Sequence, residues 1–117
     1  MRPADRPSPP TAELFDLLGR RWALRILWEL REEPVGFAEL QVRCDGMSTS
    51  VLSQRLGELR DAGLVEQRGR AGYALSDPGS RLLARLKFFD DWASQWAEQW
   101  GRAARVRGER TDLGGKR

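Results

Sequence analysis

The segment from Met47 to Arg68 constrains the fold of this chain most, because a complete helix signal is followed there at once by a strand signal. Ser48 is a favoured N-cap residue, since its hydroxyl can accept a hydrogen bond from a free backbone N–H. Gly63 can end the helix, because glycine adopts the left-handed cap conformation without penalty. We therefore predict a helix over residues 48–62, whose buried face carries leucines at helical spacing, namely Leu52, Leu56 and Leu59.

A β-hairpin is predicted directly after this helix. Residues 64–68 are typical of a short strand, residues 69–72 contain two glycines that suit a tight turn, and residues 73–76 can return as the antiparallel partner. A helix followed by a hairpin with a basic tip is the element order of a winged helix-turn-helix. The predicted fold class is therefore mainly α with a small β-hairpin.

Three shorter helices are predicted upstream, over residues 11–18, 21–31 and 37–43. Thr11 is the expected N-cap of the first of them. Residues 35–37 could form a short strand beside the later hairpin. A turn over residues 44–46 joins the third helix to the helix over 48–62, and two helices joined by a short glycine-containing turn form a helix-turn-helix.

The ends of the chain differ from its middle in composition and charge. The 117 residues carry a net charge of +3, to which residues 1–10 contribute +1 and residues 101–117 contribute +4. Residues 11–100 are therefore slightly acidic, so any case for DNA binding depends on where the arginines lie. We predict a disordered arm over residues 1–10, one domain over residues 11–100 and a flexible basic tail over residues 101–117.

The sequence lacks residues and motifs that several classes of function require. The chain has no histidine and a single cysteine, Cys44, which argues against a zinc site, a histidine-based catalyst or an internal disulfide. It also lacks a glycine-rich phosphate loop, so we expect no enzyme, no catalytic residue, no metal and no cofactor. A small buried residue is the preferred interpretation of Cys44, with an exposed reactive thiol as the alternative. No apolar run is long enough to span a membrane, which makes the cytoplasm the expected compartment and a membrane an unexpected partner.

The outer face of the helix over 48–62 is small, polar and nearly uncharged, which suits a DNA major groove about 12 Å wide. Gln54 can pair with adenine through two hydrogen bonds, and the helix N-terminus favours a phosphate. Arginines in the hairpin could hold phosphates or enter a minor groove. Arg55 flanks the core face and could equally pair with Glu39 or Glu58. The candidate DNA-binding residues are Arg43, Ser48, Thr49, Ser50, Ser53, Gln54, Arg55, Arg68 and Arg70.

Residues 80–100 are predicted to form one long helix of roughly 30 Å. Its apolar side is broad and aromatic, and a small monomer has little core left to cover it. The simplest partner is the same helix of a second copy, packed about a two-fold axis. A small aromatic effector stacked among its tryptophans is an alternative use of this surface. The candidate dimer-interface residues, including two from the first helix, are Leu14, Phe15, Phe88, Phe89, Trp92, Trp96 and Trp100.

Five short motifs follow one another in a characteristic order: Leu17–Trp22, Ile26–Leu30, Phe37–Leu40, Val51–Leu56 and Gly63–Val65. Together they resemble the HxlR-type family of bacterial winged-helix transcription regulators. The resemblance implies a homodimeric DNA-binding regulator whose first and last helices build the dimer. Some members of that family sense oxidants through a cysteine near the start of the first helix. This chain has none there, which argues against thiol-based sensing by that route.

The resulting hypothesis is a transcription regulator that binds double-stranded DNA as a homodimer on an inverted repeat. The helix over 48–62 would enter the major groove, and the wing over 68–73 would contact the backbone or the minor groove. The alternative is a winged helix used only for protein interactions, without DNA binding.

Overall fold

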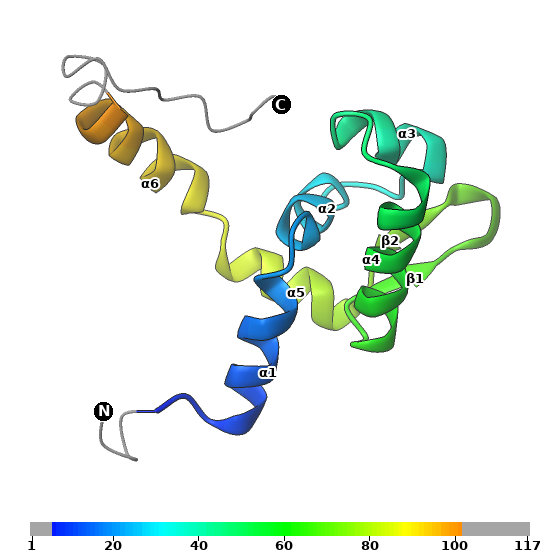
Figure 1. The fold of residues 1–117 in the computed structure, drawn as a ribbon, viewed down its shortest axis with the longest axis horizontal. Helices are drawn as coiled ribbons and strands as arrows, with labels where there is room; N and C mark the ends of the chain where they lie inside the picture. Colours follow the sequence, from blue (N-terminus) through cyan, green and yellow to red (C-terminus); the bar gives the residue numbers. More distant parts are fainter. Residues whose placement is uncertain (1–5, 102–117) are drawn as a thin grey trace. The chain divides into compact units, whose positions relative to one another are not determined.

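The computed structural model describes residues 6–101, which divide into one unit ending at Ala84 and a second beginning at Arg85 (Figure 1). The tail predicted over 101–117 lies, after Gly101, outside the described residues, as do residues 1–5 of the predicted arm. The first unit is mainly helical with one two-stranded sheet, which confirms the predicted fold class. Its elements are α1 (Pro9–Leu18), α2 (Ala23–Glu29), α3 (Phe37–Arg43), α4 (Thr49–Asp61), β1 (Val65–Gln67), the 3₁₀ turn η2 (Gly69–Ala71), β2 (Tyr73–Leu75) and α5 (Asp77–Arg85).

The first helix, α1, begins two residues earlier than predicted, and its cap is Ser8 rather than Thr11. The Ser8 hydroxyl accepts a hydrogen bond from the backbone N–H of Thr11 at 3.4 Å. Pro9 and Pro10 form the first turn, where the absence of a backbone N–H removes no helical hydrogen bond. These two prolines therefore belong to the helix and not to the arm over 1–10.

The second helix, α2, is shorter than the predicted 21–31. Trp22 has a φ of 78°, a left-handed conformation that precedes the helix, so the first helical residue is Ala23. At the other end, the backbone of Leu30 is no longer helical, with a φ of −94° and a ψ of 3°, and Leu30 is the C-cap of the helix. Ala23, Ile26 and Leu27 are fully buried, so α2 lies at the centre of the core.

The core of the first unit lies between α2, α3, α4 and the hairpin. Cys44 is fully buried in it, which confirms the interpretation of this residue as a small core side chain. Burial raises the pKa of its thiol to about 11, because the charged thiolate loses its hydration. The other buried apolar residues are Ala23, Ile26, Leu27, Leu30, Val35, Leu40, Met47, Leu52, Leu56, Leu59, Leu64, Val65, Ala74, Leu75 and Leu83.

The hairpin pairs β1 with β2 in antiparallel register, with Glu66 opposite Ala74. Val35 adds a third segment beside it, since Val35 and Tyr73 exchange two backbone hydrogen bonds of 2.8 Å each. The predicted strand over 35–37 is thus reduced to one residue, and Phe37 already starts α3. Gly72 permits this contact, because a Cβ atom there would collide with the Val35 carbonyl and its φ is 102°.

The predicted continuous helix over 80–100 is interrupted. α5 ends at Arg85, residues 86–88 form a turn, and α6 covers Phe89–Trp96 before a π-helical turn, η3, at Ala97–Gly101. The turn holds no proline or glycine, so the sequence pattern carries no signal for this break. Within residues 6–101, no helix combines the length and apolar character needed to cross a bilayer.

Candidate nucleic-acid interface

The N-terminus of α4 is built as predicted. The Ser48 hydroxyl accepts the backbone N–H of Val51 at 3.2 Å and so caps the helix. Thr49 follows, and its hydroxyl oxygen accepts a hydrogen bond of 3.1 Å from the side-chain amide of Gln41 on α3. The same Gln41 nitrogen donates to the carbonyl of Met47 at 2.8 Å. The first turn of α4 is therefore tied to α3 by side-chain hydrogen bonds.

The outer face of α4 is open to solvent. Ser50, Ser53 and Gln54 are exposed, and nothing within 4 Å would meet a side chain placed at Gly57. Figure 1 shows α4 beside the hairpin of β1 and β2. This face is small, polar and uncharged, and it is not packed inside the protomer. A duplex could therefore approach the backbone of α4 closely.

The guanidinium group of Arg55 is paired with other groups of the same protomer. Its Nε donates to the carbonyl of Arg21 at 2.8 Å, and its Nη1 lies 3.3 Å from the carboxylate of Glu58. Only 17% of the side chain is exposed. Of the two structural partners considered for Arg55, Glu58 is the one found, while Glu39 pairs elsewhere. Arg55 thus anchors α4 to the segment before α2 instead of joining the serines on the outer face.

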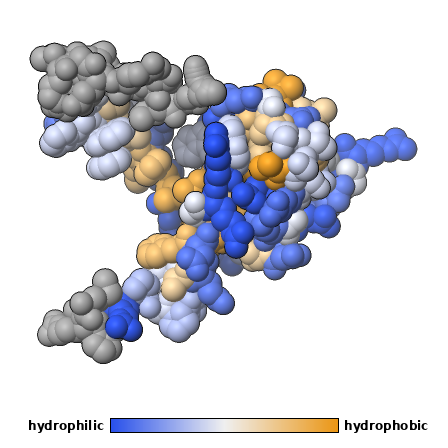
Figure 2. Space-filling view, in the orientation of Figure 1, coloured by the Kyte–Doolittle hydropathy of each residue, from blue (hydrophilic) through white to orange (hydrophobic). Residues whose placement is uncertain are grey.

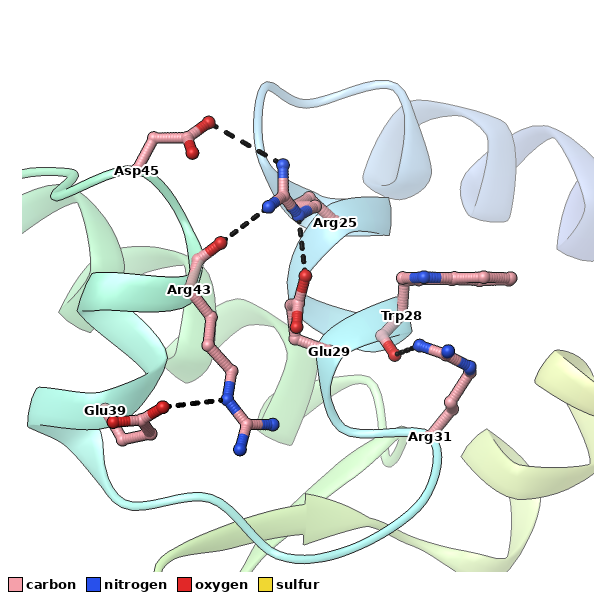
Figure 3. A network of polar contacts seen from close by, with 7 residues as sticks. All are labelled: Arg25, Trp28, Glu29, Arg31, Glu39, Arg43 and Asp45. Atoms are coloured by element: carbon pink, nitrogen blue, oxygen red, sulfur yellow. Dashed lines mark hydrogen bonds and ion pairs between the residues drawn. The ribbon is translucent and has the colours of Figure 1, made fainter. Parts of the chain in front are cut away.

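Arg43, at the end of α3, is also paired. Its Nε lies 3.1 Å from the carboxylate of Glu39 (Figure 3). Its Nη2 lies 3.7 Å from the carboxylate of Glu33. The hydrogen bond to Glu39 raises the pKa of Arg43 above its ordinary value. Two carboxylates therefore compete with any phosphate for this guanidinium.

The two arginines of the wing differ in their surroundings. Arg68 donates from Nε to Glu66 at 2.7 Å and from Nη2 to the Leu75 carbonyl at 3.3 Å. Arg70 lies in η2 at the hairpin tip, is exposed, and has no carboxylate partner among the described residues. Arg70 is therefore the wing cation that is more readily available to a phosphate.

A shallow groove runs between α4 and β1, and sequence reasoning missed its contribution. The groove adds Arg60 and Gln67, both exposed, to the polar residues beside the recognition face. Arg60 lies seven residues after Ser53, which places both on one side of a helix, so helical spacing could have identified it. Asp61 and Glu66 also line this groove, so its charge is mixed.

All of the predicted dimer-interface residues except Leu14 are exposed within the described part of the chain. On α1, Phe15 is 61% exposed, while Leu14 is half-buried. On α6, the ring centroids of Trp92 and Trp96 lie 6.3 Å apart at 8°, and Phe89 stacks on Trp92 at 6.2 Å. In Figure 2, orange hydrophobic residues and pale residues of intermediate hydropathy lie next to one another on this element. The exposed aromatic residues from residue 88 onward are Phe88, Phe89, Trp92, Trp96 and Trp100.

No group of three or more potential metal ligands occurs among residues 6–101.

Comparison with known proteins identifies the chain's relatives. The HxlR-like helix-turn-helix family matches residues 17–100. The HTH-type transcriptional regulator YvaP of Bacillus subtilis is 31% identical over 96 residues, which cover 77% of this chain and 89% of that protein. The HTH-type transcriptional regulator YodB of the same organism is 30% identical over 77% of this chain and 86% of its own length. These relatives are transcriptional regulators and not enzymes.

Solved structures of related regulators have the same fold as this chain. The quinone-bound form of Bacillus subtilis YodB superposes with a TM-score of 0.68 at 31% identity, covering 76% of this chain and 99% of that one. A possible HxlR family transcriptional factor from Thermoplasma volcanium shares the fold, with a TM-score of 0.64 over 84% of this chain and 87% of that one, at 24% identity. The chain therefore belongs to the HxlR-like helix-turn-helix family and is a winged helix-turn-helix transcription regulator.

Proposed function

We propose that two copies of this chain bind an inverted-repeat operator, each placing α4 in a major groove and its hairpin against the adjacent backbone. The observation that carries the proposal is the exposed, uncharged face of Ser50, Ser53 and Gln54, next to a wing whose Arg70 has no carboxylate partner within residues 6–101. A helix in the major groove can read base edges, and arginines beside it fix its register through phosphates.

The residues of this surface have separate roles. Gln54 reads a base edge, and adenine is the base whose N6 and N7 match its amide. Ser50 and Ser53 donate to or accept from neighbouring bases or phosphates. Ser48 and Thr49 lie at the α4 N-terminus, where backbone N–H groups favour a phosphate. Arg43 and Arg68 contribute less than Arg70, because each already pairs with carboxylates inside the protomer.

We propose that the aromatic residues of α6, together with Leu14 and Phe15 of α1, form the homodimer interface. Each aromatic side chain can bury roughly 150–250 Å², so a few of them from each copy provide most of a standard interface. The exposure of these rings in a single chain supports this role. A dimer is also what an inverted repeat requires, because each half-site needs one recognition helix.

A small aromatic effector is a second proposal that the same rings support. A quinone-bound structure exists for the relative YodB. In this chain the nearly parallel rings of Trp92 and Trp96 offer a face on which a planar molecule could stack. Binding would be non-covalent with respect to Cys44, because that thiol is fully buried and its pKa is raised to about 11.

Selection of duplexes from a random pool by the full-length protein tests the proposed function. We expect one inverted repeat to be enriched, with half-sites about one helical turn apart, and its affinity to fall steeply with salt. If no sequence is enriched and binding is insensitive to salt, the chain is a protein-interaction module and the DNA proposal is wrong.

A further inference from the structure

Arg25 on α2 uses all three nitrogens of its guanidinium group (Figure 3). Its Nε donates to Glu29 at 2.8 Å, its Nη2 donates to the carbonyl of Arg43 at 2.6 Å, and its Nη1 lies 3.6 Å from the carboxylate of Asp45. Glu29 lies on the same helix and orients the guanidinium. The other two acceptors lie at the end of α3 and in the turn that leads to α4.

Both of these distant acceptors lie in a part of the backbone that needs support. The Arg43 carbonyl is in the last turn of α3, where carbonyl groups have no partner within the helix. Asp45 has a φ of 61° and Gly46 a φ of 71°, so the turn contains two successive left-handed residues. Such a conformation is unfavourable for a residue with a side chain and persists only where its surroundings hold it.

The turn is held on its other side by Gln41, which donates to the Met47 carbonyl and to the Thr49 hydroxyl. Gln41 belongs to α3, so it ties α4 only to its neighbouring helix. Arg25 is the side chain that ties this turn to α2, which is buried in the core. Arg25 therefore adds a polar contact from α2 to the features that also orient α4 relative to the core, namely the buried leucines of α4 and the contact of Arg55 with the Arg21 carbonyl.

We propose that Arg25 is a positioning residue for sequence reading: it fixes the turn between α3 and α4 and thereby the angle at which Gln54 and its neighbours meet the bases. This inference rests on the proposed DNA-binding function. Base-edge hydrogen bonds require placement within roughly 0.5 Å, whereas phosphate contacts by flexible cations tolerate small rotations. Losing Arg25 should therefore reduce discrimination between sequences more than it reduces general affinity for DNA.

If Arg25 only stabilised the fold, its replacement would lower folding stability, and the structure predicts little such loss. The Arg25 side chain is 42% exposed, and exposed ion pairs contribute little to folding stability. The buried residues of α2 that form the core are Ala23, Ile26 and Leu27, and they remain when Arg25 is replaced. We therefore expect Arg25→Ala to fold, with nearly unchanged near-UV circular dichroism from its tryptophans.

The test compares full-length wild type, Arg25→Ala and Arg25→Lys by fluorescence anisotropy on the selected operator and on a scrambled duplex of equal length, over a salt series. Arg25→Ala should lower the ratio of the two affinities about 10-fold, the size of one lost base contact, with little change on the scrambled duplex. Arg25→Lys keeps the positive charge, but a lysine ammonium group lacks the planar fork that reaches all three acceptors of Arg25. The ratio of its affinities for the operator and the scrambled duplex should therefore also be low. The matched control is Arg31→Ala, an exposed arginine that contacts Trp28 and Glu32 and neither α3 nor the turn.

A second variant neutralises Asp45, the carboxylate that pairs with Arg25, and leaves the arginine in place. Asp45→Asn tolerates the left-handed conformation and weakens the ion pair with Arg25. It should lower the affinity ratio in the same direction, and its effect should be non-additive with Arg25→Ala in a double-mutant cycle.

The outcomes separate this inference from the function on which it rests. If wild type discriminates and Arg25→Ala discriminates equally well, Arg25 is not a positioning residue, while the proposed function stands. If Arg25→Ala weakens both duplexes alike and lowers the salt slope by about one, Arg25 is a phosphate contact and the inference is wrong. If wild type itself does not discriminate, the proposed function fails first.

Discussion

The side-chain amide of Gln54 donates to the carboxylate of Glu58 at 3.3 Å on the exposed side of α4. Glu58 does not depend on this bond, because it also receives Arg55 at 3.3 Å and Arg20 at 3.4 Å. Gln54 can therefore turn toward a base while the Glu58 carboxylate keeps its charged partners. The residue that we expect to read sequence is thus held in place in the free protein by a weak and replaceable contact.

The first prediction concerns Gln54→Ala. We expect it to lose about 1–3 kcal/mol of binding at one base position and to relax the preference there, because a bidentate pair with a base disappears. Anisotropy titrations on operators substituted at single positions measure both effects. Gln95→Ala serves as a control, since Gln95 is an exposed glutamine on α6 and belongs neither to the face of α4 nor to the groove beside it. An equal loss on every operator would show that Gln54 does not read a base.

The wing gives a second prediction, in which Arg70→Ala is compared with Arg68→Ala. Arg70 has no carboxylate partner among the described residues, so its loss should weaken all sequences alike and lower the salt slope by about one. Arg68 is tied to Glu66 and the Leu75 carbonyl, so its loss should have a smaller effect. The measurement is the slope of log affinity against log salt for each variant. A larger slope change for Arg68→Ala would reverse the roles assigned to these two arginines.

Local signals explain the parts of the fold that sequence predicted well. The bounds of α3 agree with the predicted 37–43, and α4 has the predicted cap at Ser48 and the predicted left-handed glycine at Gly63, with a φ of 78°. These features depend on residues a few positions apart, so a pattern can contain them. The three leucines of α4 are buried for the same reason, since helical spacing fixes which face they share.

The parts that sequence did not predict depend on long-range geometry or on competing choices. Ser8 caps α1 in place of the predicted Thr11, and the two prolines that follow it fit the first turn of the helix. The partner of Arg55 depends on how α4 packs against the segment before α2, which no local pattern encodes. The turn over 86–88 interrupts an apolar periodicity that continues on both sides, so the pattern predicted one helix.

A third prediction follows from the burial of Cys44. Its pKa is raised from 9.0 to about 11 in the folded chain, so the protonated thiol is favoured there. Above pH 9 the unfolded chain loses this proton first and is stabilised by doing so. The free energy of unfolding should therefore fall between about pH 9 and 11, by at most roughly 2–3 kcal/mol, and be unaffected by this group below pH 9.

Denaturant titrations from pH 8 to 11 measure this effect. The control is Cys44→Ala, which should be less stable at pH 8 but should lack the part of the decline caused by the thiol. The two proteins differ only at residue 44, so the contribution of every other group cancels in the comparison. Parallel curves for wild type and Cys44→Ala would contradict the assignment. We also expect the folded protein to resist alkylation at pH 8, because little thiolate forms and the sulfur is not accessible.

The last prediction tests the dimer through Trp96→Glu. Trp96 lies in the stacked row of rings on α6, and a carboxylate there would have to be desolvated inside an apolar interface. Sedimentation velocity of the variant should show monomers where wild type shows dimers, and its operator affinity should fall because only one half-site can be held at a time. The matched control is Val42→Glu, which places the same charge on α3 at a residue that is 68% exposed and distant in sequence from α6. The control should remain dimeric, because Val42 belongs to neither terminal helix. If both variants sediment as wild type does, the rings of α6 are not the interface, and the exposed aromatic surface is left to the proposed effector.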